Sequence, residues 1–225
     1  DQQPFFRQLH DAAQLNQPAI QEFCTSYRKI ADSYPNDRFL MGEVDGDNDT
    51  AMSVSENFTK PGRLHATYNF DLLEWAGLTV SEIREAILKA AEIFNNTGRL
   101  SFAFSNHDVP RVATRQLKAL GVSVKDSDRM QILLLKLQIS IIGSSCIYQG
   151  EELGLEDVTD IPKEKMQDPW GIEFAPTFLG RDTCRTPMVW NKKLPNGGFS
   201  RANKTWLPIA NKHLKRAAID SASDP

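Results

Sequence analysis

The sequence predicts an α/β fold in which strands and helices alternate around a parallel sheet. Short apolar segments alternate with longer segments whose apolar residues recur at helical spacing, which is typical of βαβ units. Polar and titratable side chains follow the apolar segments, as they do where parallel strands end at a functional face. The 225 residues are 40% hydrophobic and 9% aromatic, which is typical of a globular protein with a packed core. From about residue 153 the alternation stops, and an extension rich in proline and glycine follows.

The first helix is predicted over residues 17–34, where Pro18 suits the first turn. The apolar residues of this segment fall on one face of a helix. These residues are Ile20, Phe23, Tyr27, Ile30, Ala31 and Tyr34. A short apolar strand follows from about Phe39 to Val44, and residues 65–73 give a second, weaker strand pattern.

The next helix is predicted to begin at Thr79, because Thr79 and Glu82 have the spacing of a capping box. Its apolar residues at helical spacing are Ile83, Ile87, Ala91 and Phe94. Residues 95–98 close this helix, and the third strand is predicted from Leu100 to Ser105.

A helix that is apolar almost all round is predicted over residues 126–139, and it leads through Gly143 into a fourth strand in the segment SSCIYQ. Polar side chains occur at the ends of all four strands. They are Glu43, Asn69 with Asp71, His107 with Asp108, and Glu151 with Glu152. In a (β/α) barrel, active sites are built at the carboxyl ends of the strands. We therefore expect these residues to mark a functional face.

The segment FSNHDVPRVATR places Asn106, His107 and Asp108 at the end of the third strand. By itself this pattern is equally typical of a turn, because Asn and Asp bond to their own backbone and Pro110 stops a strand. We expect Asn106 to form the turn and to orient the two residues that follow it.

Glu43 follows an apolar strand and a glycine in the segment MGEV. A carboxyl group here is able to act as a general acid when apolar neighbours raise its pKa, although a surface-exposed glutamate gives the same pattern. Glycoside hydrolysis needs carboxyl groups around the anomeric carbon and side chains that hold the sugar hydroxyls. Glu43 and Asp108 on one barrel face meet part of this requirement.

A calcium loop is the main alternative for the acidic segment after the first strand. Asp45, Asp47, Asp49 and Glu56 have part of the required spacing, but the position that needs glycine is Thr50. We therefore expect a solvated acidic loop and no metal site.

Other functional classes find little support. The four histidines have no zinc-ligand spacing, and no serine or cysteine nucleophile motif occurs. The three widely spaced cysteines do not suggest a disulfide framework, which favours a reduced, cytoplasmic protein without a visible secretory signal. The net charge of -3 with scattered basic residues predicts no nucleic-acid partner. Lys136 interrupts the longest apolar stretch, so no membrane span is expected.

Five segments, in this order, resemble the second half of the catalytic domain of the α-amylase superfamily (glycoside hydrolase family 13). They are FLMGEV, FSNHDVPRVATR, YQGEELGL, GRDTCRTPMVW and GFS…TWLPI. The chain is most similar to the bacterial α-glucosidase and oligo-1,6-glucosidase branch, from about Leu15 to Ile209. The resemblance implies a partial (β/α)8 TIM barrel: strands 5–8 with their helices in residues 1–152, and a loop-rich extension after strand 8 in residues 153–225.

The resemblance also implies roles for individual residues. Glu43 matches the family's general acid/base, and Asp108 matches the carboxylate that stabilises the transition state. His107 matches a histidine that hydrogen-bonds the same sugar ring. Arg181 matches an arginine that reaches toward the substrate, with Arg185 as a nearby alternative. Structural support is expected from the residues after the eighth strand, Tyr148, Glu151 and Glu152.

The family's nucleophile has no counterpart in this sequence. It is an aspartate in a G-F-R-x-D block after the fourth strand, and no G-F-R-x-D block occurs in these 225 residues. The first half of the barrel and the C-terminal β-domain also lack counterparts. We therefore expect residues 1–225 to be the second half of a catalytic barrel in a longer enzyme and to be inactive alone.

The expected function is α-glucosidase-type hydrolysis of terminal α-glucosidic bonds by a retaining mechanism, without a cofactor. The expected substrates are small oligosaccharides that resemble maltose, isomaltose or sucrose. A glucosyl-transferring or sucrose- or maltose-isomerising enzyme and a non-catalytic sugar-binding protein stay open as alternatives. The preference for α-1,4 or α-1,6 linkages depends on a position two residues past the absent nucleophile.

Overall fold

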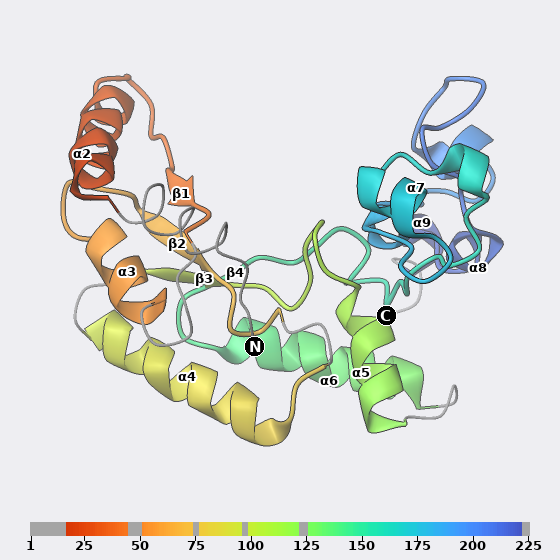
Figure 1. Ribbon diagram of the computed structural model, residues 1–225, viewed down its shortest axis with the longest axis horizontal. Coiled ribbons are helices and arrows are strands. Elements are labelled where there is room, and N and C mark those ends of the chain that lie inside the picture. Colours follow the sequence, from red (N-terminus) through yellow and green to blue (C-terminus); the bar gives the residue numbers. More distant parts are fainter. Residues whose placement is uncertain (1–16, 45–50, 74–76, 96–98, 122–125, 222–225) are drawn as a thin grey trace. The chain divides into compact units, whose positions relative to one another are not determined.

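A computed structural model of the chain describes residues 17–44, 51–73, 77–95, 99–121 and 126–221 (Figure 1). The chain divides into two compact units. The first unit is formed from Asp1–Leu72, Thr79–Phe102 and Ser140–Cys146. The second unit is formed from Leu73–Leu78, Ala103–Ile139 and Ile147–Pro225.

The first unit contains a parallel sheet of four short strands in the order β1-β2-β3-β4. The strands are β1 (Met41–Gly42), β2 (Ala66–Asn69), β3 (Leu100–Phe102) and β4 (Ser144–Ser145). Each strand pairs in parallel with the next along the chain, with Met41 opposite Ala66, Thr67 opposite Leu100 and Ser101 opposite Ser144. The predicted parallel sheet is confirmed. The edge strands β1 and β4 are shorter than the apolar segments that predicted them.

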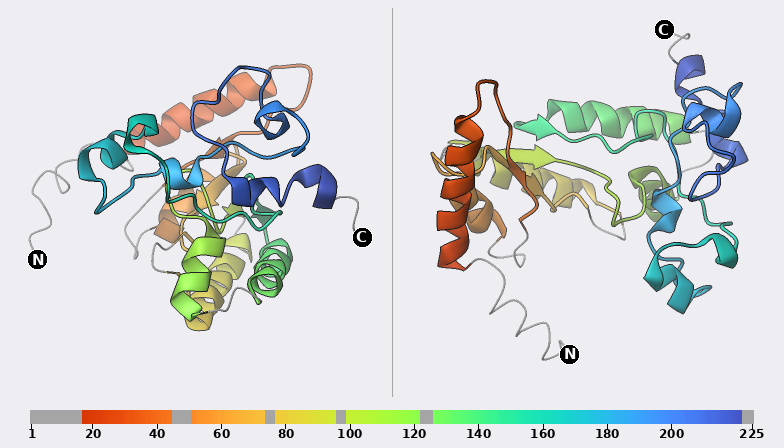
Figure 2. Two further views of the ribbon diagram at one scale, coloured as in Figure 1. Left: turned by 90° about the vertical axis from the view of Figure 1, so that its right-hand side faces the viewer. Right: turned by 90° about the horizontal axis from the view of Figure 1, so that it is seen from above.

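Three helices accompany this sheet: α2 (Pro18–Asp32), α3 (Ala51–Phe58) and α4 (Val80–Asn95). α3 contacts both β2 and α4. α2 and α4 lie on opposite sides of this unit in both figures (Figures 1 and 2).

The start of α4 has the predicted capping box. The Thr79 amide donates to Oε2 of Glu82 at 2.6 Å, and the Glu82 amide donates to Oγ1 of Thr79 at 3.3 Å. These bonds satisfy amide groups that have no partner inside a helix. Ala86 and Ala90 then form the buried face of α4.

The predicted helix over residues 17–34 is confirmed as α2, but most of its apolar face is exposed. Phe23, Tyr27 and Ile30 are 59%, 51% and 58% exposed, whereas Cys24 and Ala31 are buried. The helix therefore packs through a narrower face than the spacing of its apolar residues suggests. Burial needs a second surface to pack against, and helical spacing carries no information about that surface.

The second unit begins with two helices, α5 (Val112–Leu120) and α6 (Ser127–Ser140). The sequence predicts α6 closely. It does not predict α5, because two polar side chains, Arg115 and Gln116, are buried on this helix while Leu120 is exposed. This segment therefore lacks the apolar residues at helical spacing on which the prediction of a helix from sequence depends.

The remainder of the second unit is rich in loops, as predicted, and includes short helical segments. They are η1 (Lys163–Lys165), α7 (Pro169–Phe174), η2 (Asp182–Cys184), η3 (Pro195–Gly198), α8 (Asn211–Leu214) and α9 (Ala218–Ser221). A core of Val158, Ile161, Met166 and Leu207 holds these loops together. Within the described residues, no helix combines the length and apolar character that crossing a membrane requires.

Candidate active site

The turn after Phe104 places two of the predicted site residues. Oδ1 of Asn106 accepts hydrogen bonds from the amides of Asp108, at 2.8 Å, and Val109, at 3.0 Å. Asn106 is buried, whereas His107 is exposed and Asp108 is partly exposed. The prediction that Asn106 forms the turn and orients the following pair is confirmed.

Two arginines hold the Asp108 carboxylate. Nη1 of Arg181 lies 3.0 Å and Nη2 of Arg185 lies 2.8 Å from Oδ1 of Asp108. Within the described residues, no arginine hydrogen bond reaches Oδ2 of Asp108. The Asp108 side chain is 38% exposed, so Oδ2 is available to another donor.

His107 belongs to the same group of side chains. Its Nε2 lies 3.4 Å from Oδ2 of Asp108, and its backbone carbonyl accepts a 2.7 Å hydrogen bond from Nε of Arg185. The imidazole is 58% exposed. The structure therefore brings together His107, Asp108 and Arg181, three of the four residues that the sequence predicts for the site.

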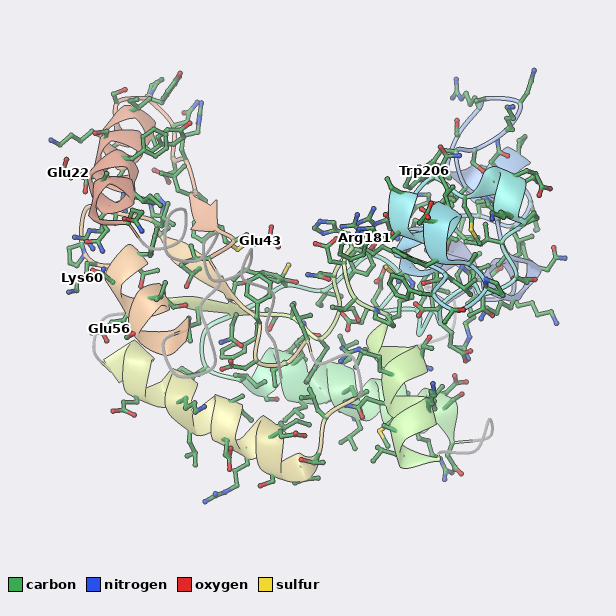
Figure 3. All side chains as sticks on the ribbon, in the orientation of Figure 1. Glu22, Glu43, Glu56, Lys60, Arg181 and Trp206 are labelled. Carbon is green, nitrogen blue, oxygen red and sulfur yellow. The ribbon has the colours of Figure 1, made fainter. Side chains whose placement is uncertain are left out.

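Glu43, the fourth predicted residue, belongs to the first unit. It lies one residue after β1 and is exposed (Figure 3). Its position after the carboxyl end of a parallel strand agrees with the sequence prediction. The other three residues belong to the second unit.

Arg181 is fixed by contacts on more than one side. Asp168, whose side chain is fully buried, accepts hydrogen bonds from Nε and Nη2 of Arg181 at 3.2 and 3.0 Å. The Arg181 guanidinium also lies 4.9 Å from the centre of the Trp170 ring. Hydrogen bonds from Arg181 hold the pKa of Asp168 below its ordinary value, and the same bonds raise the pKa of Arg181.

A second set of contacts, made by Ser105 and Glu151, holds the turn in place. Ser105 Oγ accepts the Val112 amide at 2.8 Å and pairs with Oε1 of Glu151 at 3.1 Å. Oε2 of Glu151 accepts the Tyr148 amide at 3.0 Å. Burial raises the pKa of Glu151 to about 7. These contacts link the segment after β3 to the segment after β4, which agrees with the expected supporting role of Tyr148 and Glu151.

The buried Arg111 connects further segments of the second unit by hydrogen bonds. It is only 1% exposed, and it donates to the carbonyl oxygens of Gln149, at 2.6 Å, and Cys184, at 3.0 Å. Its guanidinium also lies 5.0 Å from the centre of the Tyr148 ring. Arg111 thus ties the turn to the segment that carries Arg181 and Arg185.

Two members of the site were missed or left open by the sequence. Arg185 contacts Asp108 as directly as Arg181 does, and the motif RDTCRTP contains both arginines four residues apart. Asp168 carried no sequence signal beyond its place before a proline. An ion pair between residues 13 positions apart has no periodic pattern, so Asp168 could not be found from the sequence.

The group around Asp108 is balanced in charge. Two carboxylates, Asp108 and Asp168, face two guanidinium groups, Arg181 and Arg185. No group of three potential metal-ligating side chains occurs in the part of the chain that is described. The aspartates of the acidic loop at 45–50 lie outside the described residues. The arrangement combines hydrogen-bond donors and acceptors around a partly exposed carboxylate.

The chain belongs to the α-amylase family: the model of the alpha amylase catalytic domain matches residues 3–224. It is 41% identical over 211 residues to a Rhizobium meliloti (strain 1021) protein named "Probable alpha-glucosidase", covering 93% of this chain and 36% of the relative. It is 26% identical over 247 residues to an oligo-1,6-glucosidase of Parageobacillus thermoglucosidasius, covering 94% of this chain and 41% of the relative.

Solved structures give a consistent likeness. An alpha-glucosyl transfer enzyme, XgtA, aligns with a TM-score of 0.76 at 36% identity over 92% of this chain and 36% of that chain. A trehalose-6-phosphate hydrolase of Bacillus licheniformis aligns with a TM-score of 0.76 at 20% identity over 100% of this chain and 43% of that chain, which supports the fold alone. The chain therefore spans between 36% and 43% of the length of these four proteins.

Proposed function

We propose that the chain forms part of an α-glucosidase that hydrolyses terminal α-glucosidic bonds of small oligosaccharides with retention of configuration. The observation that carries this proposal is the group in which two arginines hold the partly exposed Asp108 carboxylate beside His107. The 41% identity to the Rhizobium meliloti protein supports the same activity.

Glu43 is the general acid/base in this proposal. Its carboxyl proton passes to the glycosidic oxygen as the bond to the anomeric carbon breaks, while an aspartate nucleophile takes up the glucosyl unit. The Glu43 carboxylate then removes a proton from the water that attacks the glucosyl-enzyme, which releases glucose and restores the acid. The exposed position of Glu43 leaves its carboxyl group open to substrate.

Asp108, His107 and Arg181 hold the glucose ring. Oδ2 of Asp108, the oxygen without an arginine contact, accepts hydrogen bonds from ring hydroxyls, and the exposed His107 imidazole donates to the same ring. Arg181 and Arg185 hold the Asp108 carboxylate in its orientation. A fixed negative charge near the anomeric carbon stabilises the oxocarbenium-like transition state.

The nucleophile in this proposal is not one of the 225 residues. We assign β1–β4 to strands 5–8 of a (β/α)8 barrel, with the extension after strand 8 in residues 153–225, and the G-F-R-x-D block belongs after the fourth strand. A retaining mechanism needs a nucleophile and an acid about 5–5.5 Å apart, so the 225-residue chain alone is expected to be inactive.

Glucosyl transfer is the second candidate. It is favoured by the 36% identity to an alpha-glucosyl transfer enzyme. Both activities share the first step, and they differ in whether water or a sugar hydroxyl attacks the glucosyl-enzyme.

Turnover of p-nitrophenyl α-D-glucoside by the complete protein encoded at this locus tests the proposal. We expect release of p-nitrophenol with α-glucose as the first product, and a loss of about 10²–10⁴-fold in kcat on Glu43→Gln. Glu22→Gln, an exposed glutamate of the same unit, is the control and should change nothing. Transfer products in excess maltose would favour the second candidate. Turnover by the isolated 225 residues would refute the assignment of the nucleophile.

A further inference from the structure

Asp168 fixes the orientation of the Arg181 side chain. Three nitrogens of Arg181 bond to the Asp168 carboxylate: the backbone amide at 2.6 Å, Nε at 3.2 Å and Nη2 at 3.0 Å. The remaining guanidinium nitrogen, Nη1, is then directed to Asp108 at 3.0 Å. A guanidinium is planar and rigid, so fixing two of its nitrogens also fixes the direction of the third.

The Asp168 carboxylate is itself held in place. Asp182, which is fully buried, accepts the Asp168 amide at 2.9 Å through Oδ2. Gly180 adjoins the same carboxylate, and a Cβ atom there would lie 2.6 Å from Oδ2 of Asp168. Gly180 has a φ of 67°, a conformation that favours glycine. A glycine is therefore required for the chain to pass this close to Asp168.

Asp168 also cancels a charge. Arg185 and Asp108 form one pair of opposite charges, and Arg181 and Asp168 form the second. Only His107 adds a positive charge to this group, and only when its imidazole is protonated. Without the Asp168 carboxylate, two guanidinium groups would face the single carboxylate of Asp108. Such a pair of arginines is the arrangement that recognises phosphate.

We propose that Asp168 is a positioning and specificity-determining residue, which holds Arg181 on Asp108 and keeps the site selective for uncharged sugars over anionic ligands. The inference rests on the proposed function for the identity of the sugar. The pairing of charges rests on the direct contacts among Asp108, Asp168, Arg181 and Arg185.

The test compares Asp168→Asn, Asp168→Glu and the control Asp160→Asn, an exposed aspartate of the same extension, in the complete protein. The readouts are kcat and KM for p-nitrophenyl α-D-glucoside, and competition by inorganic phosphate and by glucose. We expect Asp168→Asn to lower kcat/KM and to strengthen competition by phosphate by about tenfold, which corresponds to about 1.4 kcal/mol. Asp168→Glu keeps the charge and should weaken sugar binding without a gain in phosphate competition. Asp160→Asn should match the wild type.

The double variant Asp168→Asn with Arg181→Gln restores neutrality, so phosphate competition should return to the wild-type level. A purely structural role for Asp168 would impair all variants without any gain for phosphate, and this outcome would overturn the inference. So would a wild-type protein for which phosphate competes better than glucose, a measurement that needs no folded variant.

If the wild type turns over no α-glucoside, the proposed function fails, while the inference about Asp168 is still decided. Calorimetric titration with inorganic phosphate then replaces the kinetic readout, and a crystal structure of Asp168→Asn reports the position of Arg181. Tighter phosphate binding with a displaced Arg181 would support the inference. Unchanged phosphate binding with Arg181 still on Asp108 would overturn it.

Discussion

Among the described residues, the two units of the chain differ in whether charged side chains are buried. The first unit leaves large apolar side chains such as Phe23 and Ile30 on its surface, 59% and 58% exposed. The second unit buries charged groups, with Arg111, Asp168 and Asp182 no more than 2% exposed. Exposed apolar patches mark interaction surfaces, whereas buried charges persist only when they are paired. The second unit also exposes large apolar side chains, such as Leu133 at 60% and Ile139 at 61%, so the difference between the units lies in the buried charges around which the second unit is organised.

The largest expected effect is on the charge pairs of the second unit. Asp108→Asn removes the group that both Arg181 and Arg185 contact, so the carboxylate that we propose stabilises the transition state is lost. We expect a loss of about 10²–10³-fold in kcat/KM of the complete protein, with little change in thermal stability. Asp160→Asn is again the control. Activity within a few-fold of wild type would show that Asp108 does not face the reacting sugar.

The next effect separates the two faces of α2. Ala31 is buried, and its neighbour Ile30 is 58% exposed. Ala31→Glu places an unpaired charge in the packed face, so we expect destabilisation by about 3 kcal/mol or more in urea unfolding. Ile30→Glu should stay within about 0.5 kcal/mol in the 225-residue chain. If Ile30→Glu lowered the free energy of unfolding much more in the complete protein than in this chain, another part of the complete protein would cover this face of α2.

A pH effect is expected from His213 in the second unit. His213 is 2% exposed, and its Nε2 lies 2.8 Å from the Glu156 carbonyl oxygen. Burial lowers the pKa of His213 to about 4, with Arg111, Lys212 and Arg216 acting in the same direction. The unfolded chain therefore binds a proton near pH 6.5 that the folded chain accepts only near pH 4, so stability falls as the pH drops through this window.

Between pH 6.5 and 5 this loss amounts to about 1.6 kcal/mol. Urea unfolding of the wild type and of His213→Gln at both pH values measures it, since glutamine carries no titrating proton. The difference in unfolding free energy between the wild type and His213→Gln should shrink as the pH falls.

Glu151 should give a pH dependence of stability opposite in sign to that of His213. Burial raises the pKa of its carboxyl group to about 7, so the folded chain binds a proton that the unfolded chain has already released above about pH 4.3. Stability from this group is therefore present at low pH and is lost as the pH rises through 7. Relative to the wild type, Glu151→Gln should gain about 2.5 kcal/mol between pH 5 and pH 8. Glu152→Gln, at an exposed position, should show no such trend.

The sequence predicts the parts of the molecule that depend on local patterns. It predicts the parallel sheet, α2, α4, α6 and the turn at Asn106, because these follow from apolar spacing, capping and turn chemistry. It misses α5, whose buried face carries Arg115, and it misses Asp168 in the site. Both depend on pairing through space between residues that are separated along the chain. The exposed face of α2 shows the same limit, because spacing alone does not reveal what a helix packs against.

The smallest expected effect tests the local part of the first unit. Thr79 begins α4 and exchanges hydrogen bonds with Glu82 at 2.6 and 3.3 Å, both at an exposed position. Thr79→Ala removes the side-chain acceptor but leaves the packing of Ala86 and Ala90 untouched, so we expect a loss of about 0.5 kcal/mol in urea unfolding. Ser81→Ala, two residues further along and also exposed, should be neutral or slightly stabilising because alanine favours helix. If Thr79→Ala instead destabilised the chain as strongly as Ala31→Glu, α4 would depend on its cap more than on its buried face. The first unit would then be held together by local hydrogen bonds rather than by apolar packing. In this respect it would no longer differ from the second unit, which is organised around paired charges.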